Sequence, residues 1–296
     1  MDVPVCEVIR PATVAEALAA LAAREDARPI AGGTDLMVQL RDGRRLAGCL
    51  VDLGRLGLAG IRHAGEAIEV GAATTMDAIA ADAGIQRSFP ALARAARQVG
   101  AWPIQCRATL GGNLANGSPA ADTAPALLIA EAIVTVVSAA GTRRLPIAEF
   151  FLGPGRTALT PGELVTSVHL PFGKLPPGDR VVERFVKVGP RREQVISVVS
   201  LAARAVIRPD GTLAVVRLAL GSVAPTPVRA RTAERALAGG RPDAAARRDA
   251  VRAVQHDIAP IDDVRAPAGY RRIAAAVTAP SSEVDSCPSR TSVHPS

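Results

Sequence analysis

Two glycine turns carry the residues whose types and spacing are best suited to chemistry. The first reads Ala31-Gly32-Gly33-Thr34-Asp35, and the second opens the stretch from Thr109 to Asp122 with the letters Thr-Leu-Gly-Gly-Asn. Paired glycines lack Cβ atoms, so the backbone can adopt positive φ and bring its N–H groups close to a ligand. Each turn runs into an apolar, helix-like segment, and a helix N-terminus favours an anion. We expect the two turns to grip a diphosphate from both sides.

Polar side chains surround the second turn, whereas neither turn contains Lys or Arg. The sequence therefore predicts that amide dipoles, rather than side-chain charge, hold the phosphates. Thr109 and Asn113 bracket Gly111 and Gly112, and Asp122 begins a predicted helix. The carboxylate of Asp122 either caps that helix or accepts a hydrogen bond from a sugar hydroxyl, and both alternatives stay open.

A third glycine pattern, from Gly153 to Ala158, formally fits the G-x-G-x-x-A fingerprint of dinucleotide-binding folds. This fingerprint has meaning only between a strand and a helix. Pro154 lies inside the turn, and Pro161 with Gly162 prevents a long helix afterwards. We therefore reject this match as a binding site.

The cysteines and histidines are widely scattered and form neither a C-x-x-C nor an H-E-x-x-H pattern. Such spacing argues against zinc, an iron–sulfur cluster or a redox dithiol within this chain. We expect four unpaired thiols and no metal site. The four cysteines are Cys6, Cys49, Cys106 and Cys287.

The formal net charge of +7 raises the alternative of a nucleic-acid-binding module that uses its glycine turns for backbone phosphates. The basic residues are spread along the chain, and all but Lys174 and Lys187 are arginines. Aromatic residues make up only 2%, which leaves no stacking platform for bases. We expect no nucleic-acid partner, and this alternative remains the remote one.

The length of 296 residues and an apolar fraction of 48% allow two domains with separate cores. No apolar run approaches the roughly 18 residues of a membrane span. Residues 1–4 lack the basic region of a signal peptide. We expect no membrane span and a cytoplasmic location.

Hydrophobic periodicity and turn residues predict an α+β protein. Thr13 and Glu16 form a capping box ahead of a helix over 13–24, and Thr74 with Asp77 occupies capping positions ahead of a helix over 74–81. Further helices are predicted at 89–99 and 122–132, and strands at 28–31, 49–53, 68–72, 133–138, 143–147 and 164–170.

A Pro/Gly-rich segment over 172–178 marks a domain boundary. Beyond it the pattern predicts three strands and then three helices, an order typical of an α+β layer. The strands are expected at 181–188, 196–207 and 213–220, and the helices at 230–238, 242–256 and 267–277. The predicted domains are residues 1–174, with subdomains of about 1–55 and 56–174, then residues 180–277, and a disordered tail over 278–296.

Several motifs in the same order give this chain a family resemblance that covers roughly residues 4–277. The segments around both glycine turns resemble the two flavin-binding loops of the FAD-binding medium subunits of molybdenum hydroxylases, the group that includes carbon monoxide dehydrogenase and bacterial xanthine dehydrogenase. The other segments that carry the resemblance are Phe150 to Thr157, Phe185 to Gly189, Gly221 to Pro227, Asp262 to Arg265 and Tyr270 to Arg272.

The resemblance implies the fold of vanillyl-alcohol-oxidase (PCMH-type) flavoproteins, in which two α/β subdomains enclose an extended FAD. A C-terminal domain of three strands and three helices would follow. By similarity, residues 29–36 and 109–113 would wrap the FAD pyrophosphate from opposite sides. Asp122 would bind the sugar-alcohol portion of FAD, and Val99, Val165 and Lys187 would lie near the cofactor. The residues assigned to FAD in this way are Pro29, Ile30, Ala31, Gly32, Gly33, Thr34, Asp35, Leu36, Val99, Thr109, Leu110, Gly111, Gly112, Asn113, Asp122, Val165 and Lys187.

Lys187, one of two lysines, lies within an apolar strand, and two explanations for it stay open. Either it brings positive charge to the flavin, or it snorkels from the strand edge to water. The chain departs from the family pattern in two places. Cys106 stands where relatives usually carry Asn, and the sequence after Val277 turns to Ser and Pro where relatives continue their last helix.

The resemblance implies an oxidoreductase assembly in which a large subunit oxidises substrate at a molybdenum-pterin centre. A small subunit with two [2Fe-2S] clusters would pass electrons to the FAD of this chain, and the flavin would reduce an external acceptor such as NAD or quinone. The flavin supplies the chemistry in that scheme, so no catalytic residue is assigned. The principal alternative is a self-contained flavin oxidase or dehydrogenase, which would need a substrate pocket with a general base; the sequence offers none.

Overall fold

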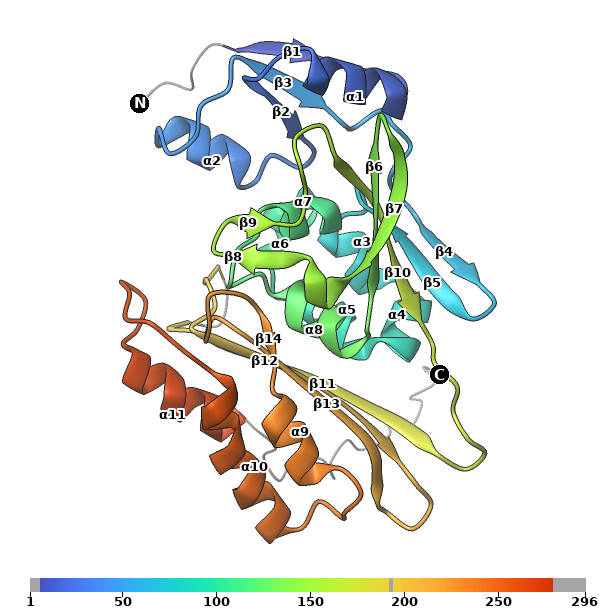
Figure 1. Cartoon of the computed structure of the whole chain (residues 1–296), viewed down its shortest axis with the longest axis vertical. Coiled ribbons are helices and arrows are strands. Elements are labelled where there is room, and N and C mark those ends of the chain that lie inside the picture. Colours follow the sequence, from blue (N-terminus) through green and yellow to red (C-terminus); the bar gives the residue numbers. More distant parts are fainter. Residues whose placement is uncertain (1–5, 192–193, 279–296) are drawn as a thin grey trace, which may run out of the picture.

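The computed structural model describes residues 6–191 and 194–278 (Figure 1). It contains both helices and antiparallel sheets, partly segregated along the chain, which confirms the predicted α+β class. Cys6, Cys49 and Cys106 are free thiols, whereas Cys287 lies outside the described residues. The predicted tail also lies outside them, except for Thr278, which is the last residue of a helix and not part of a tail.

The N-terminal unit is a parallel sheet of three short strands in the order β1-β3-β2, covered by α1 (Val14–Ala22). Thr13 caps α1 as predicted, because its hydroxyl accepts from the Glu16 N–H at 3.1 Å. The return bond of the capping box is displaced by one residue, since the Glu16 carboxylate accepts from the Ala12 N–H at 2.9 Å and not from that of Thr13. Strands β2 (Ala27–Ile30) and β3 (Cys49–Asp52) match their predictions, and the sequence reasoning missed β1 (Glu7–Ile9). Helix α2 (Leu36–Arg41) follows the first glycine turn.

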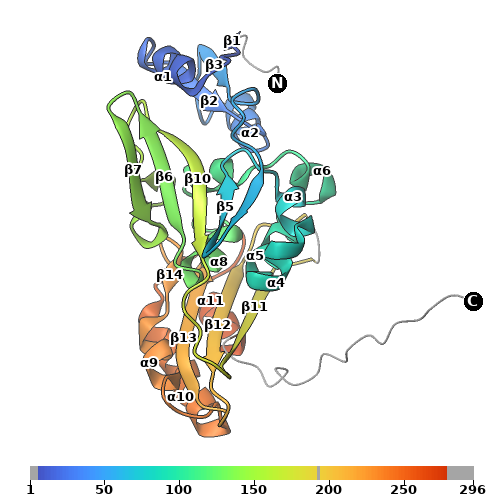
Figure 2. The ribbon, with the colours of Figure 1, turned by 90° about the vertical axis from the view of Figure 1, so that its right-hand side faces the viewer.

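The middle of the molecule is a five-stranded antiparallel sheet in the order β4-β5-β10-β6-β7. Helices α3, α4 and α5 lie on one side of it (Figure 2). The largest core cluster joins these elements to α8 (Thr123–Ile129), every residue of which is buried. The other bounds are β4 Ile61–Ala64, β5 Ala67–Gly71, β6 Ile133–Ser138, β7 Gly141–Pro146, β10 Leu164–Pro171, α3 Met76–Ala81, α4 Ala83–Ser88, α5 Pro90–Arg97, α6 Trp102–Gln105 and α7 Leu110–Ala115.

One predicted cap in this unit is wrong. Thr75, rather than Thr74, is the N-cap of α3, and its hydroxyl accepts from the Ala78 N–H at 3.3 Å. The Thr74 hydroxyl instead exchanges two hydrogen bonds with the backbone of Gly60. Buried backbone polar groups need hydrogen-bond partners, and Thr74 supplies them to Gly60. This contact depends on the tertiary fold, so the local capping pattern does not reveal it.

The C-terminal unit is an antiparallel sheet in the order β11-β12-β13-β14, followed by three helices. Successive strand residues point to opposite faces, and Ala202 joins the core of the middle unit while its neighbour Leu201 joins the C-terminal core. The sheet is therefore packed on both faces. The bounds are β11 Arg180–Val188, β12 Val199–Ile207, β13 Leu213–Gly221, β14 Val228–Arg229, α9 Arg231–Leu237, α10 Ala244–Asp257 and α11 Ala268–Thr278; β14 adds a fourth, two-residue strand to the three predicted.

A buried ion pair fastens the C-terminal sheet to the middle unit. Arg204 of β12 donates to Glu183 of β11 at 2.6 Å and to the carbonyl of Phe172 at 3.3 Å, and its guanidinium lies over the Phe89 ring. Glu183 also accepts from the Ala91 N–H at the start of α5. Burial raises the pKa of Glu183, and the neighbouring Arg204 opposes that rise.

Replacing Arg204 by methionine is expected to destabilise the protein by about 3–5 kcal/mol, because the substitution leaves the buried carboxylate of Glu183 without its counter-ion. Urea unfolding of the full chain measures this loss. The control is Arg252→Met, which breaks an exposed pair with Asp249 and should leave the unfolding midpoint unchanged. Equal midpoints for the two variants would contradict the assignment of Arg204 to the joint.

Candidate functional site

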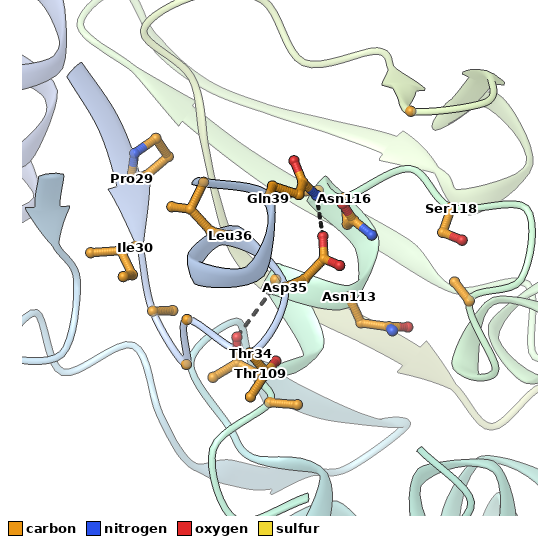
Figure 3. A pocket seen from close by; sticks show the side chains of 18 of the residues that line it. Pro29, Ile30, Thr34, Asp35, Leu36, Gln39, Thr109, Asn113, Asn116 and Ser118 are labelled. Carbon is orange, nitrogen blue, oxygen red and sulfur yellow. Dashed lines mark hydrogen bonds between the residues drawn. The ribbon is translucent and has the colours of Figure 1, made fainter. Parts of the chain in front are cut away.

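A single large cavity of about 1510 Å³ receives both glycine turns (Figure 3). Pockets for drug-sized ligands usually measure about 300–1,000 Å³, so this one has room for a longer molecule of dinucleotide size. The structure thus brings together two turns that are separated by more than seventy positions in the sequence. The assigned residues that line the cavity are Pro29, Ile30, Ala31, Gly32, Gly33, Thr34, Asp35, Leu36, Val99, Thr109, Gly112, Asn113 and Asp122.

Four of the assigned residues do not line this cavity. Gly111 and Val165 border a neighbouring space of about 100 Å³. Leu110 is fully buried in the core. Lys187 does not line the cavity itself but contacts Asp122, which does.

The first turn exposes backbone donors to the cavity. Gly33 has a φ of +71°, as the glycine pair predicts. Among the described residues, no backbone N–H of residues 31–36 donates to a protein acceptor. These residues line the cavity, and a run of backbone N–H groups without protein acceptors suits an anion.

The close approach of the two turns depends on Gly32. A Cβ atom at this position would lie 1.9 Å from the carbonyl oxygen of Arg107, just before the second turn. No heavy atom fits at that separation, so glycine is required for packing as well as for backbone freedom.

The second turn is built differently, because the N–H groups that begin α7 are already used. Those of Leu110 and Gly111 donate to the carbonyls of Thr74 and Ala72, and that of Gly112 donates to the Thr109 hydroxyl at 3.2 Å. The expectation of free donors at this helix N-terminus is therefore wrong. Asn113 compensates with its side chain: its Oδ1 accepts from Thr123 at 2.6 Å, which leaves its NH₂ group for the cavity.

Asp122 does not cap α8, which settles one of the alternatives left open by the sequence. Its Oδ2 accepts from the Lys187 ammonium at 2.6 Å, and Lys187 also donates to the carbonyl of Gln98 at 2.7 Å. The other carboxylate oxygen, Oδ1, is buried and has no hydrogen-bond partner among the described residues. Burial raises the pKa of Asp122 to about 6, and Lys187 limits that rise.

Lys187 itself is almost completely buried, with 4% of its side chain exposed. Snorkelling from a strand edge is therefore excluded. Its ammonium contacts Asp122 instead of the cavity, and this ion pair holds the carboxylate in place.

The sequence reasoning missed the basic residues of the cavity, and the expectation that only amides would face an anion is incomplete. Five arginines from segments outside the two turns contribute to its wall. They are Arg24, Arg28, Arg45, Arg156 and Arg191. Because they come from four separate segments of the chain, no local motif marks them.

The rejected glycine pattern also reaches the cavity, although not as a dinucleotide fingerprint. Its residues form a short antiparallel hairpin of β8 (Phe151–Gly153) and β9 (Arg156–Thr157), with no helix after it. Gly155, Arg156 and Thr157 line the cavity. The rejection as a Rossmann motif is confirmed, and the contact with the cavity was not foreseen.

No group of three or more His, Cys, Asp or Glu side chains in the described part of the chain could hold a metal ion. No helix in that part is long and apolar enough to cross a membrane.

The fold and the cavity define a two-part flavoprotein-type chain, with a dinucleotide-sized site in its N-terminal portion. Sequence comparison gives the same division. A family model described as the FAD binding domain in molybdopterin dehydrogenase matches residues 4–173. A second model, the CO dehydrogenase flavoprotein C-terminal domain, matches residues 184–279. The chain belongs to the family of FAD-binding medium subunits of molybdenum hydroxylases, and it is an oxidoreductase subunit whose cofactor is FAD.

Several relatives match along nearly their whole length. The xanthine dehydrogenase FAD-binding subunit of Escherichia coli O157:H7 is 33% identical over 264 residues, which cover 88% of this chain and 89% of the relative. The carbon monoxide dehydrogenase medium chain of Afipia carboxidovorans is 30% identical over 264 residues, covering 88% and 90%. Among solved structures, reconstituted CO dehydrogenase from Oligotropha carboxidovorans superimposes with a TM-score of 0.88 at 29% identity, covering 94% of this chain and 96% of that one.

Proposed function

We propose that this chain holds an extended FAD in the large cavity, with the pyrophosphate between residues 29–36 and 109–113. The seventeen residues assigned by family resemblance remain the proposed cofactor site, thirteen of them on the cavity wall and four behind it. The free amides of residues 31–36 support this placement on one side of the pyrophosphate. The amide of Asn113 supports it on the other.

The observation that carries the proposal is the unpartnered Oδ1 of Asp122. A buried carboxylate oxygen without a donor costs free energy, and this one belongs to a residue of the cavity wall. A hydroxyl of the FAD sugar-alcohol chain would supply the missing hydrogen bond. Lys187, on the other oxygen, favours the ionised form of the carboxylate and holds it in place.

We further propose that the bound flavin takes electrons from two [2Fe-2S] clusters of a partner small subunit and passes them to an external acceptor such as NAD or quinone. A large subunit with a molybdenum-pterin centre would oxidise the substrate. When bound, FAD supplies the redox chemistry, and the residues of this chain bind it, orient it and exclude water. The cytoplasmic location stays part of this proposal.

The self-contained flavin oxidase is the second candidate, and the relatives disfavour it. Two of them are named as a subunit or medium chain of a dehydrogenase. A matched structure is described as carbon monoxide dehydrogenase from Hydrogenophaga pseudoflava that lacks the Mo-pyranopterin moiety of its molybdenum cofactor; it aligns with a TM-score of 0.88 and 29% identity.

Affinity purification of the tagged chain from its native host tests the assembly. We expect about one FAD, about four irons and about one molybdenum per chain, the content of two [2Fe-2S] clusters and one molybdenum centre. Flavin absorbance and metal analysis measure these ratios in one preparation. FAD without iron or molybdenum would favour the self-contained enzyme instead.

A further inference from the structure

Gln39 spans the gap between the two glycine turns. It lies on α2, just after the first turn, and its Nε2 donates to the carboxylate of Asp35 at the end of that turn. The same Nε2 donates to Oδ1 of Asn116, which follows α7 and the second turn, at 3.1 Å. All three residues line the cavity, and Figure 3 shows them side by side.

The chemistry of these partners fixes which way each amide points. A carboxylate only accepts hydrogen bonds, so the Gln39 atom that faces Asp35 must be the NH₂ group. Both protons of that group are then committed, one to Asp35 and one to Asn116. The atom that Asn116 turns toward Gln39 must therefore be its oxygen, and its own NH₂ group faces the other way.

Asn116 consequently keeps two unused donors. No protein acceptor binds its Nδ2 among the described residues. Asn116 lies four positions after Gly112 and three after Asn113, so the three residues share one face of the chain that runs through α7. The amide of Asn113 is oriented in a similar way, because its Oδ1 accepts from the Thr123 hydroxyl and its NH₂ group is left unused within the described part of the chain.

We propose that Gln39 is a positioning residue, which uses the carboxylate of Asp35 to turn the NH₂ group of Asn116 toward the pyrophosphate of FAD. This inference rests on the proposed function, since it takes the pyrophosphate to lie between the turns. The backbone donors that begin α7 are consumed within the protein. The oriented amides of Asn113 and Asn116 replace them on that side.

The test measures the dissociation constants of FAD and of ADP for the full chain. Trp102 is the only tryptophan of the sequence, and it is 68% exposed beside the cavity residues Ala101 and Ile104. Quenching of its fluorescence therefore reports FAD binding directly, and competition reports ADP. The variants are Gln39→Met, Asn116→Ala and the combination of both.

We expect Gln39→Met to weaken FAD and ADP alike by about tenfold, the equivalent of one well-formed hydrogen bond. Asn116→Ala should cost at least as much. Adding Gln39→Met to Asn116→Ala should then change neither constant, because Gln39 acts through Asn116. The matched control is Gln255→Met, which removes a similar single side-chain hydrogen bond on α10 and should leave both constants unchanged.

Three results would overturn the inference. They are unchanged affinity in either single variant, a further loss when the two are combined, or weaker binding of FAD without weaker binding of ADP. A general loosening of the fold by Gln39→Met would appear as that further loss. If the wild-type chain and its Gln255→Met control bind no FAD at all, the proposed function fails, which is a separate outcome.

Discussion

The variant Gly112→Val should lose about 100-fold in FAD affinity while the protein remains folded. A Cβ atom at Gly112 would meet one neighbour, the Thr109 hydroxyl at 2.9 Å, and its remaining surroundings are the cavity. The valine side chain would therefore occupy ligand space, and overpacking of this kind costs about 1–3 kcal/mol. Titration with FAD, followed by Trp102 quenching, measures the loss.

The control for this variant is Gly269→Val, which makes the same change inside helix α11. No atom lies within 4 Å of a Cβ built there, and the position is not on the cavity wall. Both variants replace a helical glycine by valine, whose helix propensity is slightly better than that of glycine, so neither melting temperature without FAD should fall appreciably. Full FAD affinity in Gly112→Val would show that the cofactor does not pass this turn.

The variant Asp122→Asn should weaken FAD binding by roughly 10–100-fold, since a hydrogen bond to a charged group contributes about 1.5–3 kcal/mol. Asparagine keeps the shape of the side chain and an oxygen for Lys187, but it removes the negative charge. Spectroscopic titration with FAD checks the expected loss. The exposed Asp249→Asn serves as the control, and it should bind FAD as tightly as the wild type.

The same carboxylate predicts a pH dependence. Burial raises the pKa of Asp122 to about 6, well above the usual range of an aspartate. A ligand hydroxyl that donates to the ionised form lowers this pKa on binding, so FAD affinity should be greatest above pH 7 and fall as the pH drops through 6. The Asp122→Asn variant should lack this step. In the protein without FAD the raised pKa has the opposite consequence, because stability falls as the pH rises from about 4 to 7. An unchanged step in the variant would contradict the assignment.

Local patterns predicted most of the fold, because the signals involved are short in sequence. The N-cap at Thr13, the alternation of β11 to β13 and the turn residues between them each act over a few positions. Elements set by tertiary contacts were missed. Strand β1 has three residues and exists through its pairing with β3, and the Thr74 hydroxyl is held by a loop fourteen positions away.

In the candidate site, too, the features with a local sequence signal were predicted and those set by tertiary contacts were not. The two turns and Asp122 were predictable, since glycine pairs and a polar residue before an apolar helix are visible in the sequence. The bridge from Gln39 to Asn116 joins residues 77 positions apart, and Lys187 reaches Asp122 across 65. Only the fold determines such pairs. It also decides that the donors that begin α7 are consumed internally, which sequence reasoning had left free for the ligand.

We propose that electrons leave the iron–sulfur clusters of the partner subunit through the flavin of this chain. The most direct test reduces the purified complex with a limiting amount of dithionite, adds NAD or a quinone in separate experiments, and follows reoxidation of the clusters by their absorbance. We predict rapid reoxidation of the wild-type complex by at least one acceptor, and reoxidation about 100-fold slower in the complex that carries Gly112→Val without FAD. Equal rates in the two complexes would contradict the account.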